Sequence, residues 1–337
     1  LMMSLGGALG GLAVGLVAVK VFNANYEFGL GLALTLIIAA VMVRSLRLAI
    51  PVVLIVAGGF GGYYAYANRD YFATQQTLLM KRNFYGALSV RDYYRDDPQH
   101  AVRRFVHGVI MHGEQFQAPE RLDEATAYFR QGSGIGRTMT ALNQPNRRIG
   151  IIGLGAGTLA TYGRKGDTIR FYEINPDVIE VAHSHFSFLS RSRANIELVL
   201  GDARLAMERE APQAYDLIVI DAFSGDSIPV HLATDEALAV YLRHLKPGGV
   251  IAFHISNKFL RLAPVLQRLA DHRGLDGMSV SEPANLRDHY SSDWFLMTTD
   301  PRLRNHPAIA SQIEAVEEIP GLGLWTDDFN NLFQILK

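Results

Sequence analysis

The sequence predicts an α/β protein, in which a doubly wound sheet follows a small antiparallel β unit and N-terminal transmembrane helices. Three observations predict this order. Charged side chains are rare before residue 67 and frequent after it. Residues 83–116 alternate in the manner of antiparallel strands. From residue 147 onward, continuous apolar runs alternate with segments of helical spacing, as buried parallel strands and their crossover helices do.

Composition excludes several classes of protein. A chain of 337 residues suggests two domains. Its 32 Lys and Arg side chains balance 33 Asp and Glu side chains, which argues against a nucleic-acid partner because such proteins carry a basic face. Cysteine is absent, so the chain has no disulfide framework, thiolate metal site or catalytic thiol.

The first 67 residues are typical of a membrane segment. They hold four charged side chains, Lys20, Glu27, Arg44 and Arg47. Spanning a bilayer takes about 20 residues, and of the three apolar runs only the third reaches that length unaided. We expect about three transmembrane helices within 1–67 and a linker at 68–82. A cleaved signal peptide is the alternative for the first run, which lacks a basic start. The runs are Leu5–Val19, Phe28–Val43 and Leu48–Ala67.

The globular part divides at about residue 142. Residues 83–142 are expected to form the small β unit and a helical connector over 123–142. Residues 143–337 are expected to form the α/β domain. Its predicted strands are Arg148–Gly153, Thr168–Glu173, Ile196–Leu200, Asp216–Asp221 and Val250–Ser256.

Glycines and acids follow the predicted strands in a regular order. A glycine-rich turn after the first strand lets a ligand approach the backbone beside a helix N-terminus. Acids then follow the second, third and fourth strands, where doubly wound sheets bind ligands. Taken singly, each of these features could be only a turn, an exposed acid at a strand end or a helix cap. Together, at successive strand ends, they predict a nucleotide site. These residues are Gly153, Gly155, Gly157, Glu173, Asp202 and Asp221.

Further motifs resemble one family. The acid after the third strand, the acidic loop after the fourth and Leu245–Gly249 are similar to S-adenosylmethionine-type enzymes. Residues 83–300 resemble the spermidine synthase (polyamine aminopropyltransferase) family, and two segments resemble its bacterial membrane-fused branch. The family motifs are Tyr172–Ala182, Gly201–Ala203, the Asp221 loop, His112–Gln115 and Tyr128; the branch segments are His254–Asn257 and Trp325–Asn330.

The resemblance implies a Rossmann-like fold of the S-adenosylmethionine-methyltransferase type, and it implies transfer of an aminopropyl group. Decarboxylated S-adenosylmethionine donates the group to an amine, and methylthioadenosine leaves. Asp221 would take or relay the proton and Tyr128 would orient the amine. Glu173 would hold the ribose, Asp202 the adenine and Gln115 the donor. The implied donor-binding set is Gln115, Gly153, Gly155, Gly157, Glu173, Asp202 and Ala203.

The sequence also departs from the family pattern. Ala156 replaces the loop aspartate that holds the donor's ammonium group, and His112 replaces an aspartate upstream. The loop after Asp221 differs as well, with Asp226 as its second acid. We expect Asp226, Asp327 and Asp328 to contact the acceptor. Because an acid at position 156 would repel the carboxylate of intact S-adenosylmethionine, a methyltransferase is the alternative, and a non-catalytic nucleotide sensor is a third hypothesis.

The resemblance implies the partners, and the apolar runs and basic residues predict the location. We expect a small-molecule amine substrate, a homodimer, and a multi-pass protein of the cell inner membrane. Arg69, Lys81, Arg82 and Arg91 follow the third apolar run and favour a cytoplasmic catalytic domain, although the basic loop Arg44–Arg47 favours the opposite orientation. We expect no metal, because neither His107 and His112 nor His183 and His185 have the spacing of metal ligands.

Overall fold

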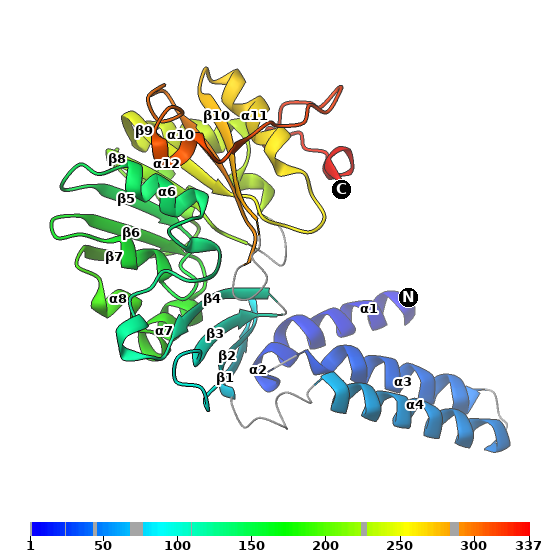
Figure 1. Ribbon diagram of the computed structural model, residues 1–337. Helices are drawn as coiled ribbons and strands as arrows, with labels where there is room; N and C mark the ends of the chain where they lie inside the picture. Colours follow the sequence, from blue (N-terminus) through cyan, green and yellow to red (C-terminus); the bar gives the residue numbers. More distant parts are fainter. Residues whose placement is uncertain are drawn as a thin grey trace. The chain divides into compact units, whose positions relative to one another are not determined.

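The computed structural model describes residues 2–23, 25–42, 46–67, 77–108, 110–223, 228–283 and 290–337. The chain divides into two compact units. The first holds Leu1–Tyr93 with Val106–Gly108, and the second holds Tyr94–Phe105 with Val109–Lys337 (Figure 1). All candidate site residues fall within the ranges of the second unit.

Apolar helices begin the first unit. Within the described part of the chain, one helical segment, Ser4–Val21, is long and apolar enough to cross a membrane. The apolar stretches Tyr26–Ala39 and Ile50–Tyr64 are shorter. The structure therefore contains one candidate span by length and composition, where the sequence predicts about three. The elements are α1 (Met2–Leu12), a π-helical turn (Ala13–Ala18), α2 (Val19–Val21), α3 (Tyr26–Met42) and α4 (Leu46–Ala67).

Helices α3 and α4 pack against each other through aromatic side chains. The rings of Tyr26 and Tyr64 lie 5.7 Å apart. Gly29 faces Phe60 so closely that a Cβ there would lie 1.9 Å from the ring. Arg82 joins α3 to the strand that follows the helices, because its two terminal nitrogens each contact a Glu27 oxygen at 2.7 Å.

Two antiparallel strands complete the first unit. They are β1 (Thr77–Asn83) and β2 (Gly86–Tyr93), paired through a tight turn in which Asn83 lies opposite Gly86. Strand β1 therefore occupies residues that the sequence assigned to a linker over 68–82. Its alternation is masked in the sequence by Lys81 and Arg82, one of which is held by the ion pair to Glu27.

An eight-stranded mixed sheet forms the centre of the second unit, in the order β12-β10-β11-β9-β8-β5-β6-β7 (Figure 1). Five strands from β7 to β9 run parallel, and β11, β10 and β12 extend the sheet antiparallel. The bounds are β5 (Arg148–Ile152), β6 (Thr168–Glu173), β7 (Asn195–Leu200), β8 (Tyr215–Ile220), β9 (Leu245–His254), β10 (Asp276–Glu282), β11 (Ser292–Thr298) and β12 (Ile313–Glu314).

Two strands and a connector precede the eight-stranded sheet, and helices connect the strands of that sheet. The strands β3 (Val102–His107) and β4 (Ile110–Phe116) are hydrogen-bonded neighbours.

The expected helical connector over 123–142 is broken, because Ala127 adopts a φ of 52°. Helices α6 (Gly134–Ala141), α7 (Pro176–His185), α8 (Phe188–Arg191), α9 (Ala203–Arg209), α10 (Asp235–His244), α11 (Leu262–His272) and α12 (Pro307–Ala310) follow, with 3-10 turns at Pro119–Arg121, Ala127–Phe129, Thr158–Tyr162, Val230–Leu232 and Leu332–Ile335.

A buried ion pair anchors the start of the first parallel strand. Arg147 is fully buried and Asp167 is 1% exposed. The guanidinium donates to the Asp167 carboxylate at 2.6 Å and also to the carbonyl oxygens of Met139, Leu142 and Tyr162. One side chain thus fixes α6, β5 and the turn before β6 to one another.

We predict that the D167A variant is severely destabilised, because it leaves the Arg147 charge buried without its carboxylate. Breaking such a pair costs about 3–5 kcal/mol. Denaturant unfolding of the detergent-solubilised protein measures the loss. R302A is the control, since Arg302 is 89% exposed in its pair with Asp300 and surface pairs contribute about 1 kcal/mol or less. Equal losses in the two variants would contradict the role assigned to the buried pair.

Candidate active site

The predicted site residues meet at the carboxyl ends of β5, β6 and β8. Ile152 lies opposite Tyr172 in β6 and Ile220 in β8. The next residue along each strand belongs to the candidate set, since Gly153, Glu173 and Asp221 follow in register. This edge of a parallel sheet is where doubly wound folds bind ligands, and the prediction of strand ends was within one residue.

The glycine loop has a backbone that other residues adopt only with strain. Gly153, Gly155 and Gly157 have φ values of 98°, 54° and 85°. A Cβ on Gly153 would lie 2.3 Å from the Asp221 carbonyl oxygen, and one on Gly155 would lie 2.4 Å from the His112 carbonyl oxygen. The loop therefore needs glycine both for its conformation and for its contact with the neighbouring main chain.

Glu173 holds this loop in place. Its two carboxylate oxygens accept hydrogen bonds from the Leu154 N–H at 3.0 Å and the Asn175 N–H at 2.8 Å. Burial raises the pKa of Glu173, and the backbone hydrogen bonds oppose part of that rise. The Ile174 N–H is a third backbone donor to this carboxylate, whose two oxygens together offer about four acceptor positions. The carboxylate is thus both a structural clamp and an available acceptor for a ligand hydroxyl.

Asp202 and Gln115 are also tied to their surroundings. Asp202 caps α9, because one of its oxygens accepts the Leu205 N–H at 2.9 Å, and its other oxygen lies 3.1 Å from His231 Nε2. Gln115, which is buried, donates to the Ser187 hydroxyl at 2.8 Å and accepts the Ser187 N–H at 3.1 Å. Ala203, which follows Asp202, is buried in the first turn of α9.

Asp221 forms the most unusual contact of the site. Its Oδ1 lies 2.7 Å from His254 Nδ1, and His254 is 4% exposed. The imidazole stacks against Tyr128 and Trp294, with ring centroids 4.4 Å and 4.7 Å away. Burial raises the pKa of Asp221, partly opposed by His254. Burial and the nearby Asp221 carboxylate raise the pKa of Tyr128 well above its usual range.

The structure describes two of the three acids expected near the acceptor, Asp327 and Asp328. Asp226 lies outside the described residues. Asp327 makes a bidentate ion pair with Arg204 at 2.5 and 2.7 Å and accepts the Thr234 hydroxyl. Asp328 is exposed. The Arg204 ion pair lowers the pKa of Asp327. The Asp327 carboxylate therefore links the C-terminal segment to α9.

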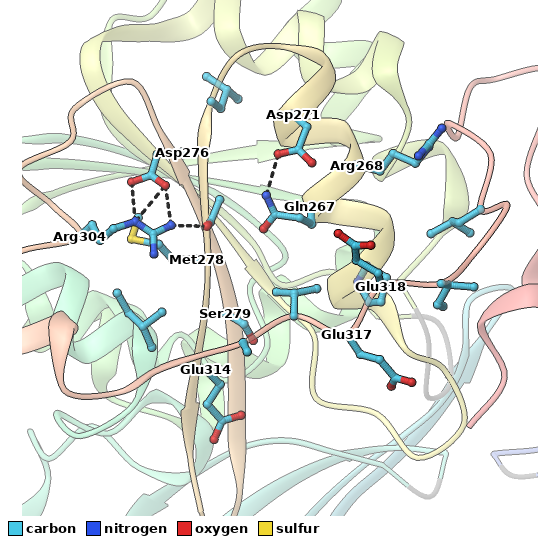
Figure 2. A pocket seen from close by; sticks show the side chains of 18 residues that line it. Gln267, Arg268, Asp271, Asp276, Met278, Ser279, Arg304, Glu314, Glu317 and Glu318 are labelled. Atoms are coloured by element: carbon cyan, nitrogen blue, oxygen red, sulfur yellow. Dashed lines mark hydrogen bonds and ion pairs between the residues drawn. The ribbon is translucent and has the colours of Figure 1, made fainter.

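A cavity of about 640 Å³ lies away from these residues, beside α11, β10 and β12 (Figure 2). Acidic side chains form part of its lining. Among them Asp276 is paired with Arg304, and Asp271 accepts a hydrogen bond from Gln267. None of the predicted site residues lines it. Among the described residues no group of three or more His, Asp or Glu side chains is arranged to hold a metal ion.

His254 is the functional candidate to which sequence reasoning gave no role. Its motif signalled only the membrane-fused branch. The contact with Asp221 depends on two adjacent parallel strands, β8 and β9, and the stacking with Trp294 depends on β11, which pairs Trp294 with His254. Strand β11 was not predicted, so the sequence did not place the two rings together.

Comparison with known proteins finds relatives in sequence and in fold. No family model matches the sequence. A polyamine aminopropyltransferase from Vibrio vulnificus is 31% identical over 181 residues, which cover 52% of this chain and 57% of that protein. An N-terminal histidine N-methyltransferase from Emericella nidulans is 30% identical over 237 residues, covering 64% of this chain and 41% of that protein.

A solved structure gives the same picture of the fold. A probable spermidine synthase from Corynebacterium glutamicum superimposes with a TM-score of 0.54 at 15% identity, covering 73% of this chain and 95% of that one. The match in sequence confirms the resemblance to the spermidine synthase (polyamine aminopropyltransferase) family, and the match in structure confirms the α/β fold class. The chain spans little more than half of the first curated relative, at 57%.

We predict a pH-dependent gain in stability for the D221N variant. A carboxyl whose folded pKa is raised binds its proton more tightly in the folded state. Stability therefore falls as the pH rises from the unfolded pKa, about 3.9, through the folded pKa. The amide that replaces the carboxylate would keep an acceptor for His254 without the buried charge, so D221N should melt at a higher temperature than wild type at neutral pH.

Thermal unfolding across the pH range measures this difference. The gap between D221N and wild type should narrow as the pH falls toward the unfolded pKa of about 3.9 and close below it, where Asp221 is protonated in both states. The exposed Asp96 provides the control, since D96N should show no such gap. A lower melting temperature for D221N at neutral pH would contradict the prediction.

Proposed function

From its similarity to polyamine aminopropyltransferases, we propose that this chain is a transferase that moves an aminopropyl group from decarboxylated S-adenosylmethionine to an amine. Methylthioadenosine is the second product. One observation carries the proposal: the glycine loop Gly153–Gly157 packs directly on the main chain of Asp221, beside a carboxylate that is largely buried. The curated relative supplies the reaction class.

The donor would bind along the carboxyl edge of the parallel strands. Glu173 would accept hydrogen bonds from the ribose hydroxyls on the lone pairs that Leu154 and Asn175 leave open. Asp202 stands at the end of the next strand, where the adenine would lie. Gln115 supports the opposite wall, because its bonds to Ser187 fix β4 to the residues packed against Gly157.

The reaction itself separates and moves charge. The amine nitrogen attacks the carbon next to the sulfonium, the C–S bond breaks, and its electron pair neutralises the sulfur. An acceptor amine that arrives protonated must first lose a proton to the enzyme. The largely buried Asp221 carboxylate would provide the negative charge that this step needs, and the Tyr128 ring stacks on the His254 imidazole that contacts it. A low-dielectric site strengthens that interaction.

Ala156 favours a second candidate, a methyltransferase that uses intact S-adenosylmethionine. This side chain is 1% exposed, and a Cβ on the facing Gly113 would come within 2.7 Å of it. A larger acidic residue has no room there, so the loop cannot supply a carboxylate to hold an aminopropyl ammonium. The similarity to the Emericella nidulans methyltransferase is consistent with this alternative.

We extend the proposal to the membrane. The segment Ser4–Val21 would cross the bilayer, and α3 with α4 would add a helical hairpin, which gives a multi-pass protein of the inner membrane. The catalytic domain would lie on the cytoplasmic side, where donor nucleotides are made, and would pair as a homodimer. The ion pair between Glu27 and Arg82 supports a fixed connection from the apolar helices to β1.

Calorimetric titration of the detergent-solubilised protein with three ligands tests the donor. We expect decarboxylated S-adenosylmethionine to bind more tightly than the intact form, and methylthioadenosine to bind as the product. Tighter binding of the intact form would replace aminopropyl transfer with methyl transfer. Binding of none of the three would overturn the nucleotide site itself.

We predict that D221A loses single-turnover transfer by about 10²–10⁴-fold, the usual contribution of a positioned acid or base. Methylthioadenosine binding should persist, because the ligands assigned to the nucleotide are other residues. Rapid-quench measurement of product with radiolabelled donor gives the rate. D96N should match wild type, and a D221A rate within a few-fold of wild type would remove Asp221 from the chemistry.

A further inference from the structure

His254 has one ring nitrogen that the fold does not use. Its Nδ1 lies 2.7 Å from Asp221 Oδ1, whereas its Nε2 is buried and has no hydrogen-bond partner among the described residues. Buried polar atoms in native proteins are nearly always paired, and a catalytic role is one of the reasons for an unpaired one. The arrangement therefore needs an explanation beyond packing.

A second buried histidine shows what a structural imidazole looks like in this protein. His244 is fully buried, and both of its nitrogens are satisfied. Its Nε2 donates to the Met207 carbonyl oxygen at 2.8 Å, and its Nδ1 accepts the Gln213 N–H at 3.3 Å. The fold thus satisfies both nitrogens of this core histidine, and His254 differs in this respect.

The Asp221 contact fixes the tautomer of His254. An ionised carboxylate can only accept hydrogen bonds, so Nδ1 must carry the proton that lies between them. The lone pair of the neutral ring is then on Nε2, the nitrogen without a partner. This is the arrangement of a general base held by a carboxylate, in which one nitrogen is oriented and the other receives a proton.

Aromatic neighbours hold the ring and suit its charged form. The Tyr128 and Trp294 rings are inclined to the imidazole by 20° and 23°, which is close to parallel. Phe223 meets it edge to face at 5.0 Å. Aromatic faces attract cations, and both stacked rings present their faces to the imidazole beside the Asp221 carboxylate.

We propose that His254 Nε2 takes the proton from the attacking amine and that Asp221 is a positioning residue behind it. This inference rests on the proposed transfer reaction. The acceptor ammonium gives one proton to Nε2, and the freed nitrogen lone pair forms the new N–C bond. The C–S bond breaks with its electrons going to sulfur. The imidazolium then releases its proton to solvent, which restores the base.

Replacement of His254 tests the proposal. H254Q should reduce single-turnover transfer by about 10²–10⁴-fold and leave calorimetric binding of methylthioadenosine unchanged. H183Q is the matched control, because His183 is exposed on α7. H254Q transfer at the wild-type rate, with wild type active, would overturn the role of His254 alone. Absence of transfer by wild type with every donor would overturn the proposed function and this inference together.

Chemical rescue separates a base from a packing element. H254A leaves a slot beside Tyr128 and Trp294 that a free five-membered ring can enter. Added imidazole should restore transfer by at least about tenfold, while pyrazole, a ring of the same size and much weaker basicity, should not. Equal rescue by both rings would show that the side chain only fills space. D221A retains its own imidazole and should gain nothing from either ring.

Discussion

The contact between Gly153 and the main chain of Asp221 is the constraint on which the candidate site depends. Two parallel strands, β5 and β8, end side by side, and only a residue without a Cβ lets their carboxyl ends approach this closely. The close approach places the glycine loop and the Asp221 carboxylate in one small volume. Glu173 secures the same loop from the neighbouring strand, through its bond to the Leu154 N–H.

The carboxylate at Asp221 is held at a cost in stability. Burial disfavours its charge, and the His254 contact compensates only in part. Proteins retain such groups where reaction chemistry requires them, and they offset the loss elsewhere. In this chain the offset includes a sheet whose central strands are fully buried, together with the Arg147 network at the opposite ends of the strands.

Much of the parallel half of the fold could be predicted from the sequence. The strands β5 to β8 follow from continuous apolar runs, and their bounds were found within one residue. The start of β9 was not found, because Lys246–Gly249 has the composition of a turn. In the structure these residues extend the strand, with Gly248 at a φ of 74° and Thr298 donating to the Gly249 carbonyl oxygen.

The antiparallel half of the sheet was harder to predict, because its pairing joins distant parts of the chain. Strand β11 pairs with β9 over a long separation in sequence, and local patterns carry little information about such pairing. The predicted site residues Gly153, Glu173 and Asp221 converge as expected. The role of His254 depends on that long-range pairing with Trp294, and it could be found only once β11 was in place.

The stacking of Trp294 on His254 also gives the chain an internal optical probe. The protein has two tryptophans. Trp325 is buried in the apolar core cluster, whereas the Trp294 ring lies 4.7 Å from the imidazole. A protonated imidazole quenches indole emission far more strongly than a neutral one does. The contribution of Trp294 to the emission, unlike that of Trp325, would therefore report a change at the His254 ring without any label.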